Sequence, residues 1–589
     1  MPRTTLALTS FVSGEFGNKL TGRTDFEKYQ SAARTMENFL VHPQGAATRR
    51  VGTQFISEVK DSTKKTRLIP FEFSTTQTYI LEFGDQYIRF FKDKGQILSS
   101  GSAYEISSPY LEAELFDIKF AQSADVMYLV HPNHDVRKLS RTGHTSWSLA
   151  TVSFSGSPSL PISGSNNRPS SVSFYEQRLA FAGTNNNPQT IWFSKAGDYE
   201  NFTTGTNADD AMIYTIASNQ VNAIRYLKAQ RTLVVGTSGG EFTVSADGTD
   251  ASITPTNVTI KKQSSYGSAN VDAVAAGNAI LFLQKAKRKI RELAYNFDSD
   301  SYVAPDLTIL NDAVTESGIV QMEWQQEPDN ILWCVREDGQ LAALTYQRSE
   351  AVVSWHRHIL GGSFGSGNAV VESIASISGV LNEDELWCIV KRTINGSTKR
   401  YVECFSDFNF DETDATDFKF LDSHLTYSGS ATTSLSGLSH LEGQTVSILA
   451  DGSVHANKTV SSGSITLDRS VTKAVVGLSY DSVLQTMRIE GGAAEGTSQG
   501  KTKRISKVVL RLFETVGVKV GPSLSNLETI PFRTTSSKLS APVETLLEGD
   551  KEIEFNDDFN SDGFIFIKQD QPLPASILAI YPTLVTNDG

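Results

Sequence analysis

The stretch NILWCVREDGQLAALTY at residues 330–346 decides the fold, because it returns in altered form as DELWCIVKRTINGSTKRYVECF at residues 384–405. Each contains Leu-Trp-Cys, and each consists of a short apolar run, a polar turn and a second alternating run. Runs rich in β-branched and aromatic residues, broken by Gly, Asn or Asp, are typical of β-hairpins. The two Leu-Trp-Cys tripeptides hold two of the three cysteines and two of the six tryptophans, so the pattern indicates either a thiol site or a repeat.

Five earlier stretches have the same texture and favour the repeat, with a spacing of about fifty residues. They are TYILEFGDQYIRFF (78–91), VMYLVHPNHDVRKLS (126–140), RLAFAGTNNNPQTIWFS (178–194), TLVVGTSGGEFTVS (232–245) and AILFLQKAKRKIRELAY (279–295). The spacers contain further strand-like runs, so each unit predicts a four-stranded sheet. Radial repetition of such sheets is a β-propeller; the alternative is a β-sandwich with coincidental spacing. In a propeller, Trp333 and Trp387 occupy equivalent inner strands of neighbouring blades, and Cys334 and Cys388 are small buried hydrophobic residues.

The predicted fold class is all-β, a propeller of about seven blades with an N-terminal helix and a small C-terminal β-domain. The predicted domains are an N-terminal segment with an amphipathic helix (1–65), the propeller (66–405), an inserted β-domain (406–490) and a C-terminal β-rich segment that completes the platform (491–589). The helix is expected at 25–40, where Thr24 or Asp25 can cap it. Its apolar face would hold Phe26, Tyr29, Ala33, Met36 and Leu40.

Composition limits the class of protein. The net charge is −13. A protein that binds nucleic acid through its phosphates needs an excess of Lys and Arg, so the composition argues against that class. The cysteines Cys334, Cys388 and Cys404 form no CxxC pair, which argues against a disulfide framework or a zinc site. The N-terminal stretch lacks the apolar core of a secretory signal, and no apolar run reaches the roughly 20 residues of a membrane helix. We expect a soluble protein that folds in a reducing cytoplasm.

Three short motifs resemble catalytic or ion-binding signatures. GGSFG at 361–365 matches a nucleophile elbow, but a strand-like run follows it where a helix is required, so we predict a loop between blades. DFNSDG at 558–563 matches the first half of an EF-hand loop, but the twelfth position is Gln569 rather than Glu, so we predict a hairpin turn. SADGTDAS at 245–252 has the wrong spacing for a sialidase Asp box and lacks its Trp.

Two histidine pairs and one basic run remain. His131 and His134 lie in a predicted turn, and His356 and His358 share a strand face; either pair could supply half of a metal site, yet no carboxylate or third His lies near in sequence. We therefore predict structural or exposed histidines. If the run KAKRKIRE at 285–292 is a strand, Lys285, Lys287, Lys289 and Arg291 share one face and could meet an acidic partner or phosphates. The alternative, which we favour, is a solvated hairpin.

Several longer stretches resemble one known family, the tail nozzle proteins (tail tubular protein B) of short-tailed bacteriophages. They include RTMENFLVHPQGAATRRVGTQFISEVK, RLIPFEFSTTQTYILEFGDQYIRFF, SSYGSANVDAVAAGNAILFLQKAKRKIRELAY, YVAPDLTIL, GIVQMEWQQEPDNILWCVREDGQLAALTY, RISKVVLRLFETVGVKVG and QDQPLPASILAIYPTLVTNDG. Family members often have a Pro in the early SGE segment and after the Arg pair, where this chain reads SGEFGNKL and RRVGT. Those departures put the local turn geometry in doubt.

The resemblance implies a structural virion protein of the tail: a homohexameric ring that attaches to an adaptor protein, supports fibres or spikes, and forms a gated conduit for double-stranded DNA. It implies no catalytic, cofactor-binding or metal-binding residues and no enzyme activity, and it leaves the DNA-facing residues unknown. We expect an acidic or neutral channel, with the basic run 285–291 away from it, and no membrane insertion. The alternatives are a tailspike-type propeller that binds or hydrolyses glycans, which needs paired carboxylates, and an adhesion module in the β-rich region after Leu421.

Overall fold

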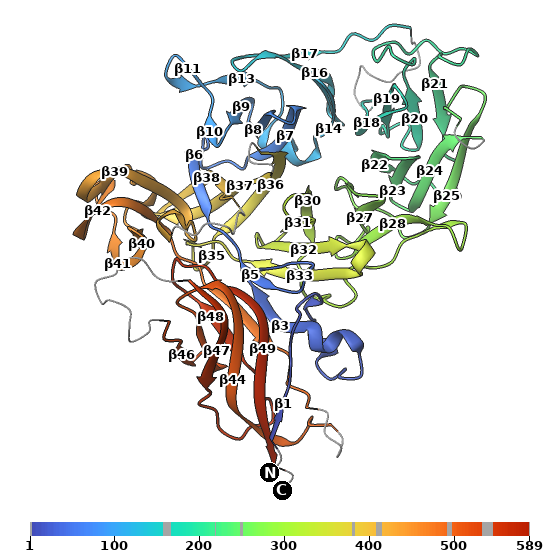
Figure 1. The fold of residues 1–589 in the computed structure, drawn as a ribbon. Coiled ribbons are helices and arrows are strands. Elements are labelled where there is room, and N and C mark those ends of the chain that lie inside the picture. The colour runs from blue at the N-terminus through green and yellow to red at the C-terminus, as the bar shows by residue number, and fades with distance from the viewer. Residues whose placement is uncertain are drawn as a thin grey trace.

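The computed structural model describes residues 3–156, 167–217, 220–247, 251–379, 383–407, 415–491, 497–532 and 546–587. Strands make up nearly all of the regular structure in these ranges (Figure 1). The helical elements described are short 3-10 segments: η1 (Asn18–Leu20), η2 (Glu27–Ser31), η3 (Glu112–Asp117), η4 (Arg348–Glu350), η5 (Ala415–Asp417) and η6 (Ser439–Leu441). Within the described ranges, no helix combines the length and hydropathy that a membrane crossing requires.

Seven four-stranded antiparallel blades follow one another through the described part of the chain and surround a common centre (Figure 1). Blades one to three are β7 (Arg67–Ser74), β8 (Gln77–Gly84), β9 (Tyr87–Lys92) and β10 (Gly95–Gln96); β14 (Lys119–Ser123), β15 (Val126–His131), β16 (His134–Gly143) and β17 (Ser146–Thr151); and β18 (Ser171–Tyr175), β19 (Arg178–Ala182), β20 (Thr190–Phe193) and β21 (Met212–Thr215). Blades four to six are β22 (Ile224–Ala229), β23 (Leu233–Thr237), β24 (Gly240–Ala246) and β25 (Val258–Ser264); β26 (Val274–Ala276), β27 (Ala279–Leu283), β28 (Ile290–Asn296) and β29 (Ser301–Val303); and β30 (Ile319–Gln325), β31 (Ile331–Arg336), β32 (Leu341–Gln347) and β33 (Val352–His358). The predicted all-β propeller of about seven blades is confirmed.

The seventh blade closes the ring with a strand that precedes the first blade in sequence. Its strands are β36 (Val370–Ser378), β37 (Asp384–Ile394), β38 (Ser397–Phe405) and β6 (Thr53–Glu58). The inner strand β36 packs against β7, and the Leu68 backbone N–H donates to Ser373 Oγ at 3.0 Å. Because β6 pairs with β38, the ring cannot open without breaking a β-ladder.

The Leu-Trp-Cys repeat occupies the second strand of blades six and seven, as predicted. Trp333 packs in the core between these two blades, whereas Trp387 packs in the core between blade seven and blade one. Adjacent side chains on a strand point to opposite faces, so Cys334 faces blade five and Cys388 faces blade six. Each tryptophan thus packs on the following blade and its neighbouring cysteine on the preceding one.

A small β-unit follows the propeller, inside the predicted 406–490 region. Its strands are β39 (Asp422–Ser436), β40 (Thr445–Ala450), β41 (Ser453–Thr459) and β42 (Ser464–Leu478), in the sheet order β39-β42-β40-β41. They enclose an aliphatic core of their own. One residue pair, His424 with Gln54, continues this sheet into β6 of blade seven.

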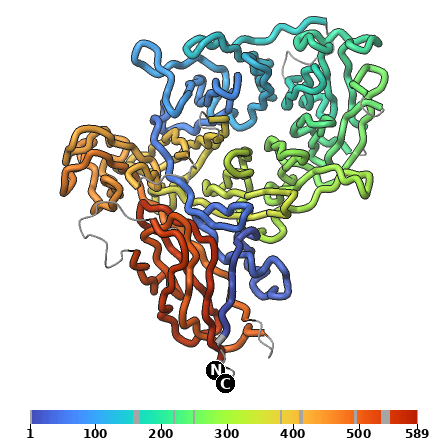
Figure 2. The backbone as a smooth tube through the Cα atoms, viewed as in Figure 1, coloured from blue at the N-terminus to red at the C-terminus, as the bar shows by residue number. Residues whose placement is uncertain are grey.

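The two ends of the chain build a two-sheet unit together, with both termini at its far tip (Figures 1 and 2). One sheet combines β1 (Arg3–Thr5), β4 (Phe39–Val41), β5 (Ala47–Arg49), β44 (Thr502–Thr515), β47 (Leu547–Glu554) and β49 (Ser576–Asn587). The other joins β33 of blade six to β2 (Gly14–Glu15), β3 (Ala32–Glu37), β43 (Ser482–Thr486), β48 (Phe566–Gln569), β45 (Lys519–Ser523) and β46 (Asn526–Thr529). One apolar core contains residues of both sheets. The predicted segments 1–65 and 491–589 therefore do not form separate domains, because their strands interleave in one unit.

The remaining described strands form edges and small hairpins. They are β13 (Glu105–Ser107), which pairs with β9, the hairpin β11 (Leu98–Ser99) with β12 (Ser102–Ala103), and the hairpin β34 (Ser363–Phe364) with β35 (Gly367–Asn368).

The predicted amphipathic helix at 25–40 is wrong. A single 3-10 turn, η2, is followed by the strand β3, which pairs antiparallel with β43 and parallel with β2 and β33. The register shifts between Ala33 and Thr35, so this bulged strand buries both Ala33 and Met36. A spacing of three residues between buried side chains imitated a helix, and tertiary strand pairing overrode the local pattern.

Candidate functional site

The inner strands of the first six blades line a cavity of about 160 Å³ at the propeller centre. Five charged side chains reach it: Arg67, Lys119, Lys228, Asp272 and Glu323. They come from blades one, two and four, from the segment before β26, and from blade six. The cavity is therefore a place where charges from far-apart parts of the chain converge.

An ion pair and hydrogen bonds to backbone carbonyl oxygens position two of the cationic side chains of this cavity, Lys119 and Arg67. Lys119 Nζ lies 2.8 Å from Asp272 Oδ1, and the Lys119 side chain is buried. Arg67 Nη1 donates to the carbonyl oxygens of Leu115 at 2.9 Å and Ile118 at 2.7 Å. These contacts fix the linker between blades one and two against the cavity wall.

Glu323 is the residue in this cavity that is best suited to acid–base chemistry. Burial raises its pKa to about 7, against the opposing effects of a hydrogen bond from Gln321 and the charge of Arg67. Gln321 Nε2 lies 3.3 Å from Glu323 Oε1 and 2.6 Å from the Ile374 carbonyl oxygen. A carboxyl group with a pKa near 7 can donate a proton at neutral pH.

The cysteines of the repeat offer no thiol chemistry. Cys334, Cys388 and Cys404 are fully buried, and burial raises the pKa of each thiol. The reactive form of cysteine is the thiolate, which these environments disfavour. They act as core residues, in agreement with the sequence prediction for the first two.

The nucleophile-like and calcium-like motifs are turns. Ser363 begins the small hairpin β34–β35, which lies between blades six and seven and leads into a strand, as predicted. In the 558–563 segment, Asn560 Oδ1 accepts from the backbone N–H groups of Asp562 and Gly563 at 2.9 and 2.7 Å, which closes a turn before β48. It is not the predicted hairpin turn, because the flanking strands β47 and β48 lie in different sheets. Asp562 pairs with Arg488 at 2.7 Å. Part of the 245–252 segment lies outside the described residues.

The basic run does not share one strand face, and the alternative prediction, a solvated hairpin, is the one that the structure confirms. Residues 285–288 form the turn between β27 and β28, where Lys287 has a φ of 61°. Lys289 pairs with Asp306 at 2.8 Å. The Arg291 guanidinium lies 3.5 Å from the centroid of the Tyr266 ring and donates to Gln284 and to the Ala304 carbonyl oxygen.

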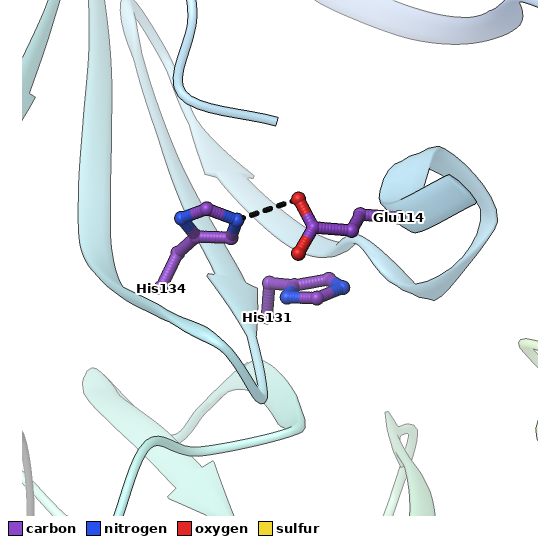
Figure 3. A group of neighbouring side chains, drawn as sticks. All are labelled: Glu114, His131 and His134. Atoms are coloured by element: carbon purple, nitrogen blue, oxygen red, sulfur yellow. Dashed lines mark hydrogen bonds and ion pairs between the residues drawn. The ribbon is translucent and has the colours of Figure 1, made fainter. Parts of the chain in front are cut away.

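The two histidine pairs have different environments. His356 Nδ1 and His358 Nε2 lie 2.7 Å apart, and both rings are buried. Burial lowers the pKa of His356 to about 3 and holds that of His358 well below its usual value. This pair is structural, as predicted. Glu114 on η3 lies beside the turn of His131 and His134 (Figure 3), so a carboxylate that is distant in sequence does accompany this second pair.

No pattern in the sequence indicated Glu114 or the five charged residues at the propeller centre. Glu114 is 20 residues from His134 and sits on a linker between blades. The central residues fall in or beside the first strands of different repeats, so aligning those strands by the fifty-residue period would have brought most of them to one place.

Comparison with known proteins adds the fold neighbours. No family model matches the chain, and no curated protein matches it. Three similar solved structures are the RRP9 WD40 repeats (9% identity, TM-score 0.37, 61% of this chain and 100% of that one), the Pan2 WD40 domain of Neurospora crassa (10%, 0.36, 62% and 96%) and the Cps50 (Swd1) propeller domain of Myceliophteria thermophila (8%, 0.36, 60% and 99%).

These comparisons correct the expected family. The neighbours reported are WD40 propeller domains of eukaryotic proteins rather than phage tail proteins, and no phage relationship is shown. The identification of the chain as a tail nozzle protein is wrong, while the β-propeller itself is confirmed.

Proposed function

We propose that the chain is a structural subunit that performs no covalent chemistry and holds its propeller in a fixed relation to two further β-units. The observation that carries this proposal is a fully buried ionic network where the three units meet. Arg50 forms a bidentate pair with Asp422, at 2.9 and 2.7 Å, and both side chains are fully buried. Such planar pairing is directional as well as strong.

The network reaches every unit. Asp422 at the start of the small β-unit also accepts from the backbone N–H of Gly361, between blades six and seven, at 2.7 Å. Thr53 on β6 donates hydrogen bonds both to Asp422 and to Glu403 of blade seven. Glu403 in turn forms an ion pair with Arg392. The Arg50 guanidinium lies 3.7 Å from the centroid of the Tyr480 ring, just before β43 of the two-sheet unit. A rigid connection between the propeller and the two β-units suits a structural subunit that transmits position or force from one unit to another.

The specific assembly that we propose is a homo-oligomeric ring of six copies in the tail of a virion, through which double-stranded DNA passes. It would attach to an adaptor protein and support fibres or spikes. Support comes from the net charge of −13, because an acidic wall leaves DNA phosphates hydrated and unbound. A ring requires heterologous contacts that close by rotation, each burying well over about 1,000 Å².

The copy number in an isolated particle that carries the chain tests this assembly. Mass measurement and electron microscopy are expected to give six copies around an open channel. Three copies, or a chain that stays monomeric in the particle, would overturn the ring. A parallel gel-shift assay with duplex DNA at physiological salt is expected to show no retention by the purified chain.

A glycan-hydrolysing propeller is the second candidate, because Glu323, with a pKa of about 7, and Asp272 line the same cavity. Glycosidases use such a pair, one carboxyl group protonated and one ionised. A panel of chromogenic glycosides distinguishes the two proposals. Turnover that is abolished by Glu323→Gln and by Asp272→Asn would favour the enzyme, whereas the structural proposal expects no turnover by the unaltered chain.

A further inference from the structure

Three potential metal ligands meet at the junction of blades one and two (Figure 3). Glu114 comes from the 3-10 helix η3, which connects the two blades. His131 ends β15 and His134 begins β16, and the two histidines face each other across the ladder. Because directly paired residues project to the same side of a hairpin, both imidazoles point toward Glu114. One ligand atom from each residue lies within 4.8 Å of the other two.

The hydrogen bonds of the cluster leave one buried ring nitrogen without a partner among the described residues. His134 Nε2 lies 2.7 Å from Glu114 Oε2, and the Asn133 backbone N–H donates to His131 Nδ1 at 3.0 Å. The other ring nitrogen of His131, Nε2, is buried and has no hydrogen-bond partner among the described residues, and neither has the nearby Tyr110 hydroxyl. The His131 ring is thus held by one hydrogen bond and by packing against Tyr110 and His134, and Nε2 is the nitrogen left without a hydrogen bond in the described part of the chain.

We propose that Glu114, His131 and His134 bind one zinc ion, with water completing a tetrahedral site. Two imidazoles and one carboxylate are borderline ligands that favour zinc over calcium or magnesium, which prefer oxygen. Zinc would replace the hydrogen bond between His134 and Glu114 and that between Asn133 and His131. For zinc to bind His134 Nε2, a proton on that nitrogen must move to Nδ1 of the same ring or to solvent.

The bound ion would clamp η3 to the β15–β16 turn. The same linker carries the carbonyl oxygens of Leu115 and Ile118, which accept hydrogen bonds from Arg67 at the central cavity. A metal here therefore stiffens both the junction of blades one and two and one wall of that cavity. This inference is independent of the proposed assembly.

Zinc titration of the full chain, purified in the presence of a chelator and then freed of it, tests the proposal. Calorimetry is expected to show one equivalent of zinc, with affinity reduced at least tenfold by Glu114→Gln or His134→Asn. Glu112→Gln on the same 3-10 helix and His144→Asn in the next turn are the matched controls, expected to stay within twofold. Cobalt substituted for zinc should give the visible bands of a tetrahedral nitrogen–oxygen site, and calcium and magnesium should not compete.

Two results would overturn the proposal: no zinc binding by the unaltered chain, or unchanged binding when Glu114→Gln and His134→Asn are combined. Circular dichroism of each metal-free variant checks folding. If either ligand variant fails to fold, the unaltered chain still decides the matter, because the absence of tetrahedral cobalt bands rules out the site. The third ligand is tested separately by His131→Asn.

Discussion

Arg50 and Asp422 form a bidentate ion pair with no exposed surface, although 372 residues separate them. Burial alone pushes the pKa of Asp422 upward, and the charge of Arg50 outweighs it, so the pKa lies below its usual value. The pair is therefore ionised, and removing one member leaves a buried charge without its partner.

Asp422→Asn is accordingly expected to lower the free energy of unfolding by about 3–5 kcal/mol, the range typical of a broken buried pair. Urea unfolding followed by fluorescence measures this change. The matched control is Arg511→Gln, which breaks an ion pair with Asp550 whose side chains are about half exposed. That control should cost much less stability, because solvent screens an exposed ion pair. Equal effects of the two variants would contradict the central role of the network.

Trp333→Ala and Trp387→Ala should destabilise the protein to a similar extent, about 3–5 kcal/mol each, because the residues fill equivalent cores between blades. Thermal unfolding of the two variants provides the comparison. Phe297→Ala removes an aromatic ring that is 86% exposed, and it should leave stability nearly unchanged. A much smaller loss at either tryptophan would argue against the equivalence of the two positions.

Gly52→Ala is expected to impair folding, because an added Cβ would lie 1.9 Å from the Leu421 carbonyl oxygen. This contact brings the strand that closes blade seven against the start of the small β-unit, so backbone must move to admit a methyl group. The expected loss exceeds about 2 kcal/mol. Gly22→Ala, where no atom lies within 4 Å of the added Cβ, is the control and should keep the melting temperature of the unaltered chain.

Glu82 makes stability depend on pH. Burial raises its pKa from 4.5 to about 7, partly offset by a hydrogen bond from the Tyr87 hydroxyl. The folded state then binds more protons than the unfolded state between these two values, so the contribution of Glu82 is fully present below about pH 4.5 and is lost as the pH rises through about 7.

The measurement for Glu82 is urea unfolding of the unaltered chain and of Glu82→Gln at pH 5 and at pH 8. The unaltered chain should lose stability relative to the variant on going to pH 8, by a few kcal/mol at most. A stability difference between the two proteins that stays constant over this range would show that Glu82 does not titrate as described.

The period of about fifty residues determined the propeller from the sequence alone, since hairpins recur only where the same local pairing is repeated. Trp333 and Trp387 could be assigned to equivalent strands for the same reason. The helix at 25–40 could not be judged locally, because β2, β33 and β43 recruit that segment into a sheet. Strand pairing between distant segments has no local signature, and here it decided the outcome.

The sites depend on tertiary structure for the same reason. Sequence showed His131 and His134 as a pair, but only the fold brings Glu114 to them. The charges at the propeller centre come from separate blades, so their neighbours, and hence the raised pKa of Glu323, exist only once the ring has closed. Composition and period are properties of the chain as written, whereas burial and electrostatic environment arise from contacts between residues far apart in it.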